Sequence, residues 1–299
     1  MNARALALAM LLVVLCALPA AAQGDFSAVE IKAEKVADGI YTLTGRGGNL
    51  GLSVGEDGTY LIDDQYAPLT GKILAAIKQL TPEPVRFVVN THYHGDHTGG
   101  NENMGEAGAL LVAHENVRRR MAAGTFMKAF NRQVEPAPAG ALPVVTLTDA
   151  VTFHWNGEEI RVFFVGPAHT DGDAIIHFVK ADVFHMGDTL FNGMYPFIDV
   201  SAGGRIDGMI AAVDRVLKVA DDKTRLITGH GPPVATKADL QVYRDMLAQV
   251  RDRVAKLKAE GKTGEQIVAA KPTADLDEKW GGGFMKPDVW VGLVYESMK

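Results

Sequence analysis

The chain carries, at residues 90–101, the stretch Asn90-Thr91-His92-Tyr93-His94-Gly95-Asp96-His97-Thr98-Gly99-Gly100-Asn101. Three imidazoles and one carboxylate fall within six positions of this stretch, directly after an apolar, β-branched run at 85–89. A packed core has no need of such a cluster, because buried polar groups cost free energy unless they are paired. Zinc prefers imidazole nitrogen and carboxylate oxygen, so the stretch predicts a metal site at the end of a strand.

The spacing of these side chains accommodates two ions. His92 and His94 are two positions apart, so a locally extended backbone aims both at one ion. Asp96 and His97 follow Gly95, where a tight turn of the chain directs them toward a second ion.

Three other segments have the same design, in which a strand-like run ends in a glycine-containing turn with one ligand-type side chain. These segments are 163–170, 184–189 and 226–232, and they present His169, Asp188 and His230. Functional side chains concentrate on loops that a rigid scaffold positions. We therefore expect one site assembled from several strand ends.

Short β-branched and aromatic runs alternate with segments of helical periodicity in both halves of the chain. Expected strands cover 39–43, 50–54, 59–63, 85–90, 151–155, 160–165, 174–179, 183–186 and 225–228, and expected helices cover 70–80, 206–219 and 237–257. This alternation predicts two sheets packed face to face with helices outside, in an α+β fold. Residues 133–143 are expected to form a surface loop beside a site, and 271–287 an irregular tail.

The motif at 91–97, together with Ala168-His169-Thr170, Gly187-Asp188 and Gly229-His230-Gly231, resembles the metallo-β-lactamase superfamily over essentially the whole chain after residue 22. The resemblance implies an αββα sandwich with outer helices and with two zinc ions at one edge of its two mixed sheets. It also implies which ligands hold each ion. By this likeness His92, His94 and His169 hold the first ion, Asp96, His97 and His230 hold the second, and Asp188 bridges both.

The ligand set departs from that of some branches of this superfamily. Asp188 stands where the metallo-β-lactamases with a cysteine ligand in the second site carry that cysteine. In this respect the set is similar to those of glyoxalase II, lactonases and other dinuclear relatives. The glutathione-binding residues of glyoxalase II find no match here.

Two metal ions that share a water lower its pKa toward about 7 and supply a hydroxide for attack on a carbonyl or phosphoryl centre. The leading hypothesis is therefore an exported hydrolase that uses a metal-bridging hydroxide to open an ester or amide carbonyl of a small molecule. A β-lactam or a lactone is the substrate type we favour. The alternatives are thioester hydrolysis, phosphodiester or sulfate ester hydrolysis, and a mononuclear iron dioxygenase that acts on persulfides.

Two residues are candidates for catalytic roles beyond metal binding. Asp96 is expected to orient the attacking hydroxide. Tyr195 lies in the apolar segment 188–199, which has the length of a substrate-facing loop, and its hydroxyl is a candidate donor to a developing oxyanion. Plain packing is the alternative role for Tyr195.

The first 22 residues have the layout of a secretory signal peptide, with Arg4 before an uncharged apolar run and small residues at 20–22. A single domain is expected over 23–299, in the periplasm or secreted, without stable membrane association after cleavage. Cys16 is the only cysteine, and it lies in this leader, so no disulfide or cysteine ligand is expected in the mature protein. The oligomeric state has no signature in the sequence.

The remaining composition is that of an ordinary globular protein. The net charge of -6 is spread over short blocks, and it gives no support to nucleic-acid binding. Arg118 to Arg120 are expected on the solvated side of a short helix, with recognition of an acidic ligand as the alternative; together with Arg205 they are the candidate cations for a phosphate or sulfate substrate. Met121, Phe126, Met127 and Phe130 are expected either to line a pocket mouth or to pack.

Overall fold

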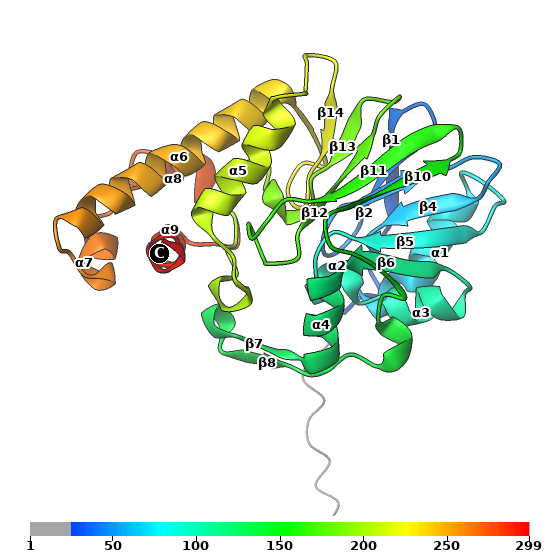
Figure 1. The fold of residues 1–299 in the computed structure, drawn as a ribbon, viewed down its shortest axis with the longest axis horizontal. Coiled ribbons are helices and arrows are strands. Elements are labelled where there is room, and N and C mark those ends of the chain that lie inside the picture. Colours follow the sequence, from blue (N-terminus) through cyan, green and yellow to red (C-terminus); the bar gives the residue numbers. More distant parts are fainter. Residues whose placement is uncertain (1–24, 299) are drawn as a thin grey trace, which may run out of the picture.

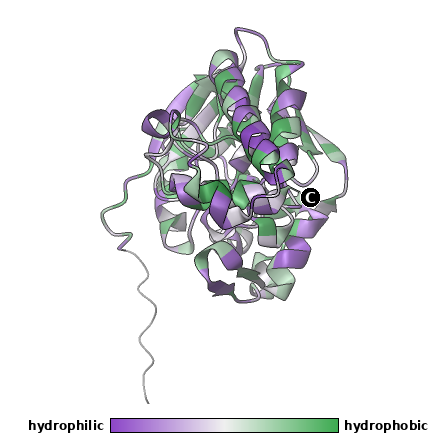
Figure 2. Cartoon of the chain, turned by 90° about the vertical axis from the view of Figure 1, so that its left-hand side faces the viewer, coloured by the Kyte–Doolittle hydropathy of each residue, from purple (hydrophilic) through white to green (hydrophobic). Residues whose placement is uncertain are grey.

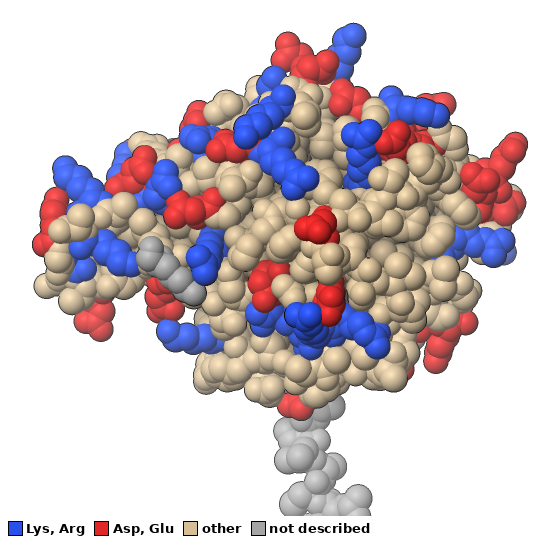
Figure 3. All heavy atoms as spheres, viewed as in Figure 1, with Lys and Arg blue, Asp and Glu red and all other residues tan. Residues whose placement is uncertain are grey.

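The structure is a computed structural model that describes residues 25–298. The expected signal peptide at 1–22 lies outside the described residues. Within 25–298, no helix combines the length and apolar character that crossing a membrane requires. On the face that Figure 3 shows, Lys and Arg side chains lie in mixed groups with Asp and Glu side chains, separated by uncharged areas.

The first sheet has an antiparallel half and a parallel half. Its seven strands, in spatial order, are β1 (Lys32–Ala37), β2 (Ile40–Thr44), β3 (Leu50–Ser53), β4 (Thr59–Ile62), β5 (Val85–Asn90), β6 (Leu110–His114) and β9 (Val145–Leu147). Strands β1 to β4 pair antiparallel, whereas β4, β5, β6 and β9 are parallel. The carboxyl ends of β4 and β5 therefore meet at the same edge of the sheet.

The second sheet is mostly antiparallel. Its six strands, in spatial order, are β10 (Ala150–Trp155), β11 (Glu158–Phe164), β12 (Ala174–Phe178), β13 (Val183–His185), β14 (Arg225–Ile227) and β15 (Val234–Thr236). The pair β13 and β14 is parallel, so the residues that follow these two strands also lie at one edge.

Helices cover the outer faces of both sheets (Figure 1). The α-helices are α1 (Thr70–Lys78), α2 (Gly95–Thr98), α3 (Asn101–Glu106), α4 (Glu115–Ala123), α5 (Ile206–Leu217), α6 (Lys237–Ala259), α7 (Gly264–Ala269), α8 (Asp277–Trp280) and α9 (Pro287–Ser297). Short 3-10 helices are η1 (Ala67–Leu69), η2 (Lys128–Phe130), η3 (Ala139–Ala141), η4 (Gly187–Thr189) and η5 (Val200–Ala202).

Among the described residues, three large hydrophobic cores hold these layers together, and a smaller fourth one includes Tyr93 and Met121. The central core joins the inner faces of the two sheets through side chains such as Tyr60, Val112 and Phe178. A second core lies between the first sheet and α1, and a third lies between the second sheet and α5, α6 and α9. Apolar and hydrophilic residues alternate along the helices that face the viewer in Figure 2, as helices with one buried face require. The layer order is helix, sheet, sheet, helix, as the sequence predicts.

Two segments differ from the expectations. Residues Arg132–Val134 form strand β8, which pairs with β7 (Thr125–Met127) in a separate hairpin, so the expected loop at 133–143 is only partly irregular. The expected irregular tail at 271–287 includes α8, and it buries Trp280 and Met285 in the third core. Both segments are held by tertiary contacts that lack a local sequence signature.

Candidate metal centre

All seven proposed ligands lie at the edge where strands of the two sheets end. Strand β5 leads into His92 and His94, and α2 begins at Gly95 directly after them. The remaining ligands come from α2, from the loop between β11 and β12, from η4 and from the turn after β14; they are Asp96, His97, His169, Asp188 and His230.

His92, His94, His169 and Asp188 form one buried group, in which one ligand atom from each residue lies within 4.8 Å of the others. Nδ1 of His94 lies 3.1 Å from Nε2 of His92 and 2.9 Å from Nε2 of His169. Oδ2 of Asp188 lies 3.4 Å from Nε2 of His169. Three ring nitrogens and a carboxylate therefore converge on one point.

Asp96, His97 and His230 form a second group, which Asp188 joins to the first. Nε2 of His230 lies 3.3 Å from Oδ2 of Asp96 and 3.3 Å from Oδ2 of Asp188. The other oxygen of Asp188, Oδ1, lies 3.2 Å from Nε2 of His97. Asp188 is the residue shared by both groups, as the resemblance implies.

The surroundings of these groups fit metal ions. Oδ1 of Asp188 is buried, and within the described chain it has no hydrogen-bond partner of good geometry. A buried carboxylate oxygen that lacks a well-aligned hydrogen bond and has only the His97 ring nitrogen nearby costs free energy that a bound cation recovers. Burial lowers the pKa of His169 to about 4, so at neutral pH its ring is uncharged and offers a lone pair.

In the second group, the carboxylates and the imidazoles each favour the charged form of the other. Burial disfavours charge on His230, but the carboxylates of Asp188 and Asp96 outweigh burial and raise its pKa to about 9. Burial likewise opposes ionisation of Asp188, yet His230 and His97 lower the pKa of this carboxyl well below its usual range. A metal ion that binds here therefore displaces a proton from imidazole.

The outward nitrogen of each histidine in the first group has an acceptor that orients the ring. Nδ1 of His169 donates to the carbonyl oxygen of Phe197 at 2.8 Å, and Nε2 of His94 lies 3.0 Å from Oδ2 of Asp199. Asp199 also accepts a hydrogen bond from the Tyr93 hydroxyl at 2.5 Å. Such outer partners fix the tautomer that turns the other nitrogen toward a metal.

Asp63 likewise orients a histidine ring, that of His97. It directly follows β4, and its Oδ2 lies 2.8 Å from Nδ1 of His97. The same carboxylate accepts hydrogen bonds from the backbone and the hydroxyl of Thr91, whose Oγ1 lies 3.0 Å from Nδ1 of His92. Neither Asp63 nor Asp199 is among the residues that the sequence predicts at the site. An acidic residue directly after an apolar strand was the available signal for Asp63, whereas Asp199 has none.

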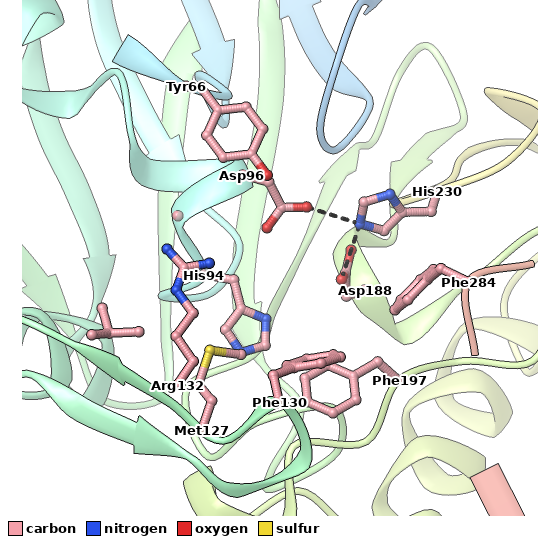
Figure 4. A pocket seen from close by; sticks show the side chains of 12 residues that line it. Tyr66, His94, Asp96, Met127, Phe130, Arg132, Asp188, Phe197, His230 and Phe284 are labelled. Carbon is pink, nitrogen blue, oxygen red and sulfur yellow. Dashed lines mark ion pairs between the residues drawn. The ribbon is translucent and has the colours of Figure 1, made fainter. Parts of the chain in front are cut away.

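The ligand groups open into a cavity of about 320 Å³. Its polar end carries Asp96, Asp188 and His230, which dashed lines connect in Figure 4. The rest of the wall is mostly apolar, and it comes from the hairpin, from the segment before η5 and from the loop before α9. The other lining residues are Tyr66, His94, Gly95, Met127, Phe130, Arg132, Val134, Phe197 and Phe284.

Tyr195 is not part of this site. Its ring is fully buried and stacks on Trp290 with 4.2 Å between the ring centroids. Its hydroxyl donates to Oδ1 of Asp277 at 2.8 Å, so the predicted hydrogen bond to an oxyanion is wrong for this geometry. The packing of α9 and α8 against the segment 188–199 turns Tyr195 away from the metal ligands, although Phe197 of the same segment reaches the cavity.

Of the other apolar residues and arginines that the sequence singles out, some line the cavity and others do not. Met127 and Phe130 line the cavity, whereas Met121 packs beside Tyr93 and Phe126 is exposed. The three arginines of α4 have partners of their own, and none lines the cavity. Arg118 donates to the carbonyl of Pro143, and Arg119 and Arg120 pair with Glu115 and Asp171.

Comparison with known proteins agrees with this geometry. Residues 43–257 match the model of the Metallo-beta-lactamase superfamily. The hydroxyacylglutathione hydrolase of Maricaulis maris is 28% identical over 213 residues, which cover 67% of this chain and 68% of that protein. The enzyme of the same name from Gloeobacter violaceus is 34% identical over 108 residues, 36% of this chain, and the match spans only 35% of that relative's length.

Solved structures share the fold at low sequence identity. A metallo-beta-lactamase from Pontibacter korlensis has a TM-score of 0.62 and 19% identity, covering 73% of this chain and 99% of that chain. The sec-alkylsulfatase Pisa1 from Pseudomonas sp. has a TM-score of 0.66 and 21% identity, covering 90% of this chain and 50% of that chain. Since the family model covers more than half of the sequence, and the fold and the ligand groups agree with it, the chain belongs to the metallo-β-lactamase superfamily.

Proposed function

We propose that the protein is an exported, zinc-dependent hydrolase that opens an ester or amide carbonyl of a small molecule, with a β-lactam or a lactone as the favoured substrate type. The observation that carries the proposal is the shared carboxylate of Asp188, which joins two ligand groups at the polar end of one cavity. Two zinc ions bound there supply an activated water and polarise the carbonyl oxygen.

The residues that line the cavity have different proposed roles in binding and hydrolysis. Asp96 and Asp188 both line the cavity, but the Asp96 side chain is 24% exposed and that of Asp188 is 4% exposed. Asp96 therefore orients the attacking water through its carboxylate, and Asp188 is confined to ligation. The apolar wall around Phe130 and Phe197 excludes bulk water and holds the apolar part of the substrate.

Thioester hydrolysis is the second candidate, because both curated relatives described above are named hydroxyacylglutathione hydrolases. Phosphodiester and sulfate ester hydrolysis have less support. The sequence candidates for binding such anions, Arg205 and the arginines of α4, do not line the cavity, which among the described residues has Arg132 as its single arginine or lysine.

Metal content and hydrolysis test the proposal together. Protein purified without chelator is expected to contain about two zinc ions per chain by mass spectrometry, and to hydrolyse a β-lactam, a lactone or a hydroxyacylglutathione thioester. Dialysis against a chelator removes turnover, and added zinc restores it. One iron per chain, or two zinc ions with no turnover on any of these substrates, would contradict the proposal.

Export rests on the leader-like residues 1–22 alone. Expression of the full chain in a Gram-negative host is expected to give a periplasmic protein whose N-terminal sequence begins at Gln23, because signal peptidase cuts after small residues such as Ala22. A cytosolic protein that retains residues 1–22 would exclude export.

A further inference from the structure

The β7–β8 hairpin presents a cation to the cavity between two apolar side chains. Its register pairs Met127 with Arg132 and Thr125 with Val134. Residues paired directly across an antiparallel ribbon lie on the same face, and so do residues two positions apart along a strand. Met127, Arg132 and Val134 therefore share one face, and all three line the cavity.

Arg132 has no acidic partner of its own. Within residues 25–298, its side chain takes part in no ion pair or hydrogen bond, although Arg132 is exposed and lines the cavity together with His94 (Figure 4). The arginines of the neighbouring helix α4 differ, because each of them has a partner. The acidic side chains that share the cavity with Arg132 are Asp96 and Asp188, and both belong to the ligand groups.

The charges and the aromatic rings that line the cavity indicate which kind of ligand fits it. Two bound divalent cations outweigh the charge of the two ligand carboxylates, so the polar end and Arg132 both attract negative charge. The rings of Phe130, Phe197 and Phe284 line the same cavity, and Phe284 lies on the side away from Arg132 (Figure 4). A planar guanidinium binds a carboxylate through two parallel hydrogen bonds.

We propose that the substrate is a small amphipathic acid whose carboxylate is bound by Arg132, with its apolar body against Phe130 and Phe197 and its scissile carbonyl at Asp96. This inference rests on the proposed hydrolysis and narrows its substrate class. Arg132 is then a specificity-determining residue. Through it, the hairpin favours substrates that carry a carboxylate at some distance from the carbonyl that is hydrolysed.

Binding of a matched pair of probes tests this inference without turnover. The dissociation constants of 4-phenylbutyrate and 4-phenylbutyramide are measured by calorimetry on the metal-loaded protein. The carboxylate is expected to bind more tightly, and this preference is expected to fall about ten-fold or more in Arg132→Gln, since hydrogen bonds to charged groups are stronger than those between neutral groups. Arg132→Lys keeps the positive charge but lacks the two parallel N–H donors of the guanidinium group. It is therefore expected to retain part of the preference for the carboxylate over the amide.

A charge-matched control separates contact from long-range attraction. Lys128 lies in the turn of the same hairpin, does not line the cavity and pairs with Glu296. Lys128→Gln is expected to leave the preference for the carboxylate within two-fold, roughly the change that loss of a screened surface charge produces. An unchanged preference in Arg132→Gln would overturn the inference, because the carboxylate would then bind at the metals alone. Failure of hydrolysis would leave this comparison intact.

Discussion

Asp188→Ala is expected to lower the metal content from about two ions per chain to one or fewer and to lower kcat by more than about 100-fold, the upper end of the effect of losing an outer partner of a metal ligand. The reason is that one carboxylate serves both ligand groups. Its two oxygens lie 3.2 Å from His97 and 3.3 Å from His230, and Oδ2 also faces His169. Mass spectrometry of the purified variant and steady-state rates measure the two effects.

Asp188→Asn is the matched control for shape. It keeps the size and one oxygen of the side chain but removes the negative charge, so its metal content is expected to lie between that of the parent protein and that of Asp188→Ala. Far-ultraviolet circular dichroism verifies that both variants fold. Two tightly bound zinc ions in Asp188→Ala would show that the two groups bind metal independently of the shared carboxylate.

Gly48→Ala is expected to disrupt the second ligand group without a change in charge. A Cβ atom at Gly48 would lie 2.1 Å from Cε1 of His97, which is closer than real Cβ contacts allow. The ring of His97 cannot withdraw freely, because Asp63 accepts a hydrogen bond from its far side. We expect about one zinc per chain and a loss of activity of about 10- to 100-fold or more, as for other displaced ligands.

Gly71 in α1 is the matched control for this substitution, since a Cβ added there meets no atom within 4 Å. Gly71→Ala is expected to retain the metal content and activity of the parent protein. If Gly48→Ala also retained both zinc ions and full activity, the close packing of Gly48 on His97 would have no functional consequence.

The sequence predicts which ligand candidates lie together because most of this information is local. His92, His94, Asp96 and His97 lie within one turn after a strand, and His169 follows the same pattern of strand end and glycine turn. The layers of the fold are equally accessible, since strand and helix periodicities are local properties. The structure places all seven ligand candidates together at one sheet edge.

The carboxylates that orient the histidines and the side chains that line the cavity could not be predicted from local sequence patterns. Asp199 contacts His94 across 105 positions, and no local pattern marks it. Phe284 reaches the cavity from a glycine-rich segment that looks irregular in the sequence. Tyr195 was predicted at the site because it is close to Asp188 along the chain, but its direction depends on packing against Trp290 of α9. Such contacts between distant segments appear only in the folded chain.

The hairpin at Thr125–Val134 pairs with neither of the two main sheets, and its contacts from Lys128 and Phe130 include those to Ser201 of η5 and to Phe197. The metal ligands, by contrast, lie at strand ends of both sheets and are held by carboxylates buried beside them. Insertions or exchanges confined to these ten residues are therefore expected to change the side chains that the hairpin presents to the cavity without moving the ligand groups. Evolutionary change in substrate range and preservation of the metal-binding groups would in this way be assigned to separate segments of the chain.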